Sequence, residues 1–141
     1  MGIFTRVADI ISANLNSMLE KAEDPEKMVK LMIREMEDTL VEVKASCAGA
    51  MATRKKSQRE MSEVSGRAEE WAAKALLAID KGREDLAREA LVEKRRYIER
   101  AEALERESAE IETLVHQYQE DIRQLEEKLT SAREKQRTLI Q

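Results

Sequence analysis

The side chains that could perform catalysis or hold a metal are few, and their spacing suits neither task. His116 is the only histidine in the 141 residues, so a site with two histidine ligands cannot form. Glu112 lies four residues before it, whereas di-iron helical bundles space the glutamate and histidine three apart. Cys47 is the only cysteine, and we expect it to be a small buried hydrophobe. We therefore expect no catalytic residues, no metal and no cofactor, and predict that the chain is not an enzyme.

The residue types and spacing better support another activity, in which an apolar helix face near the N-terminus inserts into lipid. Residues 1–22 predict one amphipathic helix whose apolar side chains cover about half of its circumference. Its side-chain charges cancel, so membrane affinity must come mainly from apolar insertion. Alternatively, the same face packs on the rest of the protein as a third helix. The candidate membrane-binding residues are Ile3, Phe4, Val7, Ile11, Leu15 and Met18.

A strong helix start follows this segment. Asp24 is suited to the N-cap and Pro25 to the first helical position. The proline also disfavours helical conformation at Asp24, which separates the first helix from the next one. We consider Asp24 and Pro25 a candidate hinge, and a simple cap without functional bending is the equally supported alternative.

Residues 25–141 carry a seam typical of a coiled coil. Steps of three and four pick out mainly apolar residues from Val29 to Ala78, and again from Ala87 to Leu139. A turn near residues 81–84 lies between them, and Gly82 can supply its left-handed helix cap. Folding at this turn places Leu40 opposite Leu125. The predicted fold class is all-α: a long antiparallel two-helix coiled-coil hairpin preceded by an N-terminal amphipathic helix.

The charges that flank the seam give a less consistent picture. In the same register Arg67 would face Arg100, and Glu37 would face Glu126. Exposed ion pairs contribute at most about 1 kcal/mol each, so these conflicts cannot overturn the apolar layers. We expect the charges to keep the protein soluble, with no part in choosing the partner helix.

Composition excludes several classes of protein. The net charge of −4 argues against direct nucleic-acid binding. No stretch of about 20 apolar residues could span a membrane, and the apolar start lacks the features of a signal peptide. A single cysteine suits a reducing cytoplasm. Leu76, Leu77 and Val92 lie outside the seam, which indicates further protein contacts, with scattered surface apolar residues as the alternative.

Four stretches together resemble the phage shock protein A family. They are Met1-Gly2-Ile3-Phe4, the run 21–25 (KAEDP), the run 32–37 (MIREME) and the run 82–91 (GREDLAREAL). That family includes the thylakoid vesicle-inducing proteins and is related to the ESCRT-III membrane-remodelling proteins. The resemblance covers essentially the whole chain, and general similarity favours the phage shock branch.

The resemblance implies a bacterial envelope-stress protein with two roles. It would bind the ATPase domain of an AAA+ transcription activator that serves an alternative sigma factor, and inhibit it. It would also bind anionic lipids on the cytoplasmic face of the inner membrane and maintain the membrane's integrity. The alternative is a purely structural ESCRT-III-like scaffold without a transcriptional role; a plain coiled-coil spacer is a third possibility.

Family members continue with further helices through which the full-length protein forms homo-oligomers. Here the heptads reach Leu139 without a helix stop, so we expect the chain to be a piece of something longer.

Overall fold

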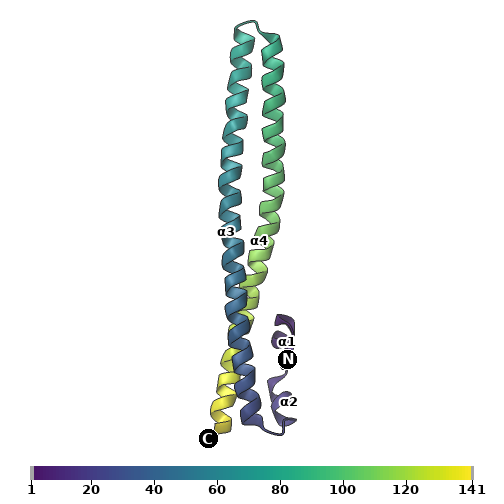
Figure 1. Ribbon diagram of the computed structural model, residues 1–141, viewed down its shortest axis with the longest axis vertical. Helices are drawn as coiled ribbons and strands as arrows, with labels where there is room; N and C mark the ends of the chain where they lie inside the picture. The colour runs from purple at the N-terminus through teal and green to yellow at the C-terminus, as the bar shows by residue number, and fades with distance from the viewer. Residues whose placement is uncertain (1, 141) are drawn as a thin grey trace. The chain divides into compact units, whose positions relative to one another are not determined.

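The computed structural model describes residues 2–140, and they are almost entirely helical. The helices are α1 (Val7–Ser12), α2 (Leu15–Glu20), α3 (Pro25–Asp80) and α4 (Glu84–Ile140). Helices α3 and α4 are long and antiparallel, and α1 and α2 are short (Figure 1). The chain forms two compact units: unit 1 comprises residues 1–49 and 115–141, and unit 2 comprises residues 50–114. The all-α hairpin predicted from the sequence is confirmed.

The predicted seam is the interior of both units. No seam position between Val29 and Leu139 is exposed; each is buried or half-buried. In unit 2 the buried seam residues near the turn are small, such as Ala75 and Ala90. In unit 1 it is lined by larger side chains, among them Met36 and Leu125. Burial of long-range partners, more than helix propensity, therefore holds the two long helices together.

The turn ends α3 as expected. Gly82 has a φ of 72°, a left-handed conformation that glycine adopts without a steric penalty. The N–H of Arg83 donates to the carbonyl of Ala78 at 2.8 Å, which satisfies a carbonyl at the helix end. At the start of α4, the Arg83 side chain pairs with Asp85 and lowers the pKa of that carboxyl.

Charged residues beside the seam find partners of opposite sign on the other arm. Arg100 pairs with Glu60 at 2.8 Å in unit 2, and Arg133 pairs with Glu37 at 3.4 Å in unit 1. Each arginine side chain is long enough to reach a glutamate that the predicted register does not place opposite it. Arg54, a charged residue on the seam, is also satisfied, because it donates to both carboxylate oxygens of Glu112. Opposite charges therefore do link the two arms.

The N-terminal segment differs from the single helix expected over residues 1–22. It contains two six-residue helices separated at Ala13 and Asn14. Ala13 is extended, with φ −64° and ψ 138°, and the Asn14 side chain accepts a hydrogen bond from the N–H of Ser17 at 3.0 Å. Asparagine is among the best N-cap residues, so it starts a new helix here instead of continuing the old one.

Candidate membrane-binding segment

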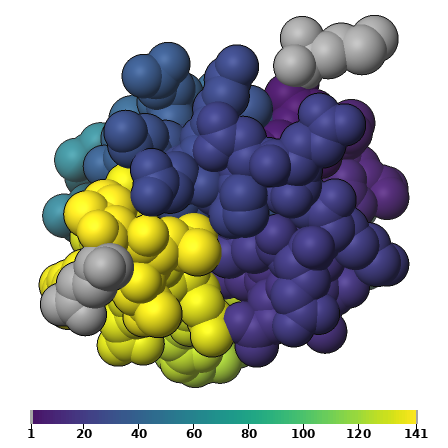
Figure 2. Space-filling model, turned by 90° about the horizontal axis from the view of Figure 1, so that it is seen from below, coloured from purple at the N-terminus to yellow at the C-terminus, as the bar shows by residue number. Residues whose placement is uncertain are grey.

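The apolar face of the N-terminal segment packs on the hairpin in unit 1. Helices α1 and α2 lie beside the first turns of α3 (Figure 1), and from the end of unit 1 the segment is seen against α3 and the last turns of α4 (Figure 2). Of the candidate membrane-binding residues, Leu15 is buried and the other five are half-buried. All six belong to one apolar cluster with residues of α3 and α4. In this conformation the structure matches the alternative of a third packed helix, and lipid binding stays a prediction.

The centre of this cluster includes residues that the two-helix pattern did not single out. Ile10 is 1% exposed and Met32 is 0% exposed. Met32 lies on α3 outside the seam, so a hairpin alone gives no reason to bury it. The sequence contained one indication of its burial: Met28, four residues earlier, lies on the same face of the helix, so the two methionines form a short apolar row beside the seam. That row is covered because the N-terminal segment packs there.

Polar contacts fix both ends of the α1 part of the segment. The carboxylate of Glu35 accepts hydrogen bonds from the N–H of Ile3 at 2.8 Å and of Phe4 at 2.9 Å. The ammonium group of Lys128, on α4, donates to the carbonyl of Ala13. Neither contact could be predicted from the sequence, because the segment contributes only backbone groups to them: N–H groups to Glu35 and a carbonyl to Lys128. Backbone groups are the same at every position and leave no signal in the sequence.

The candidate hinge forms the expected cap. The N–H of Lys27 donates to the Asp24 carboxylate at 3.2 Å, and α3 begins at Pro25. Helix α2 has already ended at Glu20. The short non-helical link between them joins the segment to the hairpin, and bending at this link remains a prediction.

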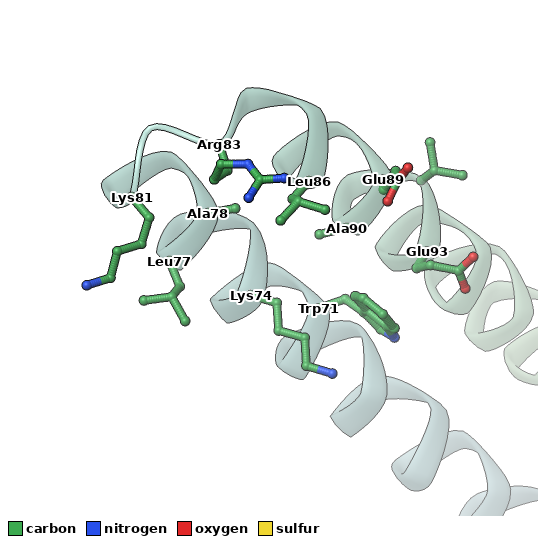
Figure 3. A pocket seen from close by; sticks show the side chains of 11 residues that line it. Trp71, Lys74, Leu77, Ala78, Lys81, Arg83, Leu86, Glu89, Ala90 and Glu93 are labelled. Carbon is green, nitrogen blue, oxygen red and sulfur yellow. The ribbon is translucent and has the colours of Figure 1, made fainter.

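A second surface of interest surrounds the turn in unit 2. Large apolar side chains are exposed on both arms there, with Leu77 58% exposed and Val92 60% exposed. They border an open groove of about 740 Å³ whose wall includes Trp71, with the Lys74 ammonium 4.2 Å from the centre of its ring (Figure 3). Leu86 borders the same groove from α4. Leu77, Leu86 and Val92, three exposed apolar residues outside the seam, therefore line one groove, which suits a contact with another protein.

The described residues offer little that could act as a catalytic or metal centre. Within 2–140, no group of three or more histidine, cysteine or acidic side chains is placed to hold a metal ion. Cys47 is buried, as expected, and His116 is exposed. In the same part of the chain, none of the helices has the length and apolar character needed to cross a bilayer.

Comparison of the sequence with known proteins points to one family. Residues 2–141 match the PspA/IM30 family. The chain is 37% identical over 143 residues to the membrane-associated protein Vipp1 of Nostoc punctiforme, a match that covers 99% of this chain and 54% of that protein. It is 35% identical over 140 residues to a phage shock protein A homolog of Deinococcus radiodurans, with 99% and 62% covered. A phage shock protein A homolog of Bacillus subtilis is 38% identical over 112 residues, with 79% and 46% covered.

Two facts follow from these similarities. The chain spans about half the length of the relatives that it matches. Sequence identity to the Vipp1 protein and to the phage shock protein A homologs is nearly the same. It therefore does not favour the phage shock branch, which general similarity of the four stretches had suggested.

Proposed function

Because the chain belongs to the PspA/IM30 family, we propose that it binds the cytoplasmic face of the bacterial inner membrane and helps to maintain its integrity. Relatives named as membrane-associated or phage shock proteins support this proposal. The observation that carries it is the N-terminal segment, which concentrates an apolar face on a short piece of chain outside the hairpin seam. Such a segment can leave the hairpin without breaking the seam.

The source of the membrane affinity follows from the charges. Arg6 and Lys21 balance Asp9 and Glu20 within the segment, and the whole chain carries −4. Attraction to anionic lipids is therefore weak, and burial of apolar surface must supply most of the binding free energy. We expect vesicle binding to change little between low and physiological salt.

Flotation with vesicles that contain anionic lipid tests the proposal. Phe4→Glu removes a large apolar side chain that is only half-buried on the hairpin. Fully burying a phenylalanine contributes about 1.5–3 kcal/mol, and part of this is lost from the packed state too, so vesicle binding should fall by up to about tenfold. Thr5→Glu, at an exposed neighbouring position, adds the same charge and is the matched control. Equal losses from both variants would show that charge alone was responsible, and the insertion face would then be wrong.

We further propose that the chain binds the ATPase domain of an AAA+ transcription activator and inhibits it in unstressed cells. Support comes from the resemblance to phage shock protein A and from the exposed apolar groove beside Leu77, Leu86 and Val92, which suits a protein partner. The competing proposal is a structural scaffold, in which homo-oligomerisation of the full-length protein on the membrane is the whole function.

Co-purification with the isolated ATPase domain distinguishes these two proposals. A regulator forms a complex with this domain and lowers its ATP hydrolysis, whereas a scaffold does neither. If membrane and activator compete for the N-terminal segment, vesicles must weaken ATPase binding by the same factor by which the ATPase weakens vesicle binding. An ATPase that stays fully inhibited while the chain is entirely vesicle-bound would contradict this competition.

A further inference from the structure

Glu35 stands out because its carboxylate accepts hydrogen bonds from two backbone N–H groups that lie 31 and 32 residues away in the sequence. It lies half-buried on α3 and accepts from two successive N–H groups, those of Ile3 at 2.8 Å and Phe4 at 2.9 Å. These two residues precede α1, so their N–H groups have no place in a helical hydrogen-bond ladder. Hydrogen bonds to an ionised carboxylate are about twice as strong as those between neutral groups. Glu35 therefore holds the very start of the segment in place.

The approach of the chain to this carboxylate is unusually close at Gly2. A β-carbon at this position would lie 2.3 Å from Oε1 of Glu35 and 2.7 Å from its Cδ. An added β-carbon would therefore displace the end of the Glu35 side chain, whose carboxylate accepts the hydrogen bonds from Ile3 and Phe4.

From these contacts we propose that Glu35 and Gly2 form a latch, which keeps the N-terminal segment on the hairpin and sets how much of it is available to lipid. The inference rests on the proposed membrane binding by residues 1–22 and adds its regulation. Phe4, whose N–H is held by the latch, is also part of the apolar face. The same residue cannot stay on the hairpin and enter a bilayer, so the latch must open before insertion.

The size of the effect follows from the fraction of molecules in which the segment is released. When only a minor state can bind, the apparent dissociation constant equals the intrinsic one divided by that fraction. Loss of a charge-assisted hydrogen bond raises the released fraction by about tenfold while that state remains minor. Opening the latch should therefore tighten vesicle binding by about tenfold.

The test compares four forms of the chain with vesicles of equimolar phosphatidylglycerol and phosphatidylcholine. Glu35→Gln keeps the side-chain shape but removes the charge and one acceptor. Gly2→Ala leaves every charge unchanged and displaces the carboxylate. The matched control is Glu37→Gln, which removes the same charge two residues away, where the side chain pairs with Arg133 and not with the segment. Hydrogen exchange of the Ile3 and Phe4 amides, without vesicles, reports latch opening directly.

Glu35→Gln and Gly2→Ala are both expected to speed this exchange and to bind vesicles about tenfold more tightly than wild type. Glu37→Gln should match wild type in both measurements. The latch is overturned if exchange at Ile3 and Phe4 is unchanged, or if exchange accelerates while vesicle affinity stays at a measurable wild-type value. If exchange accelerates but no form binds vesicles at all, the proposed lipid binding itself fails, and the regulatory role fails with it.

Discussion

Leu125→Ala should be among the most damaging substitutions in unit 1. Leu125 is 0% exposed and lies in the cluster where α3, α4 and the N-terminal segment meet. Leu31, on α3, is 42% exposed and outside the seam. Replacing a buried leucine by alanine costs about 2–5 kcal/mol, because transfer free energy is lost and a cavity remains. The same change at an exposed site is usually within about 0.5 kcal/mol.

Urea denaturation followed by the helical circular dichroism signal measures this difference. With a slope of about 1–3 kcal/mol per molar urea, Leu125→Ala should lower the midpoint by on the order of 1 M, and Leu31→Ala by a few tenths at most. Leu40→Ala, at the half-buried position predicted to face Leu125, should fall between the two. Equal midpoints for Leu125→Ala and Leu31→Ala would refute the assignment of the seam.

Two further outcomes are expected in the same protein. Gly82→Ala forces a side chain into the left-handed region and should destabilise the protein by about 1–2 kcal/mol. Gly66→Ala lies in the middle of α3, with open space at its β-carbon, and should stabilise the protein by up to about 1 kcal/mol. The melting temperatures of the two variants should therefore shift in opposite directions. Hydrogen bonds from Arg123 and then Gln124 lower the pKa of Glu120 to about 2, so its stabilising contribution is present above the ordinary value of 4.5 and is lost as the pH falls toward 2. Arg123→Gln should return the Glu120 pKa toward 4.5 in an NMR titration, and an unchanged low value would contradict the assigned cause.

The seam could be predicted from sequence because it depends on period alone. From Val29 to Ala78 and from Ala87 to Leu139, a step of three or four residues returns a side chain to the same face of a helix. Burying that face determines which residues lie inside, whatever the details of each contact. The left-handed residue at Gly82 was equally accessible, since a glycine at the end of a long helical pattern has few other uses.

The charged contacts were less predictable because they depend on the reach of long side chains. The heptad register placed Arg100 opposite Arg67, yet its guanidinium binds Glu60. A register describes where Cβ atoms lie, whereas an arginine extends several ångströms beyond its own Cβ. Local competition explains the break after α1 in the same way, because the cap supplied by Asn14 outweighs one more turn of continuous helix.

The two readings of the N-terminal face could not be separated by sequence because they use the same side chains. An apolar face has no preferred partner, so the pattern of Phe4, Ile11 and Leu15 fits a bilayer and a hairpin equally well. Substitutions on this face consequently weaken both states and report only their difference. The contacts of Glu35 and Gly2 belong to the packed state alone, since they join backbone at the start of the segment to one carboxylate on α3. Changing Glu35, which lies on α3, therefore shifts the balance between the two states without altering the surface that would enter the membrane.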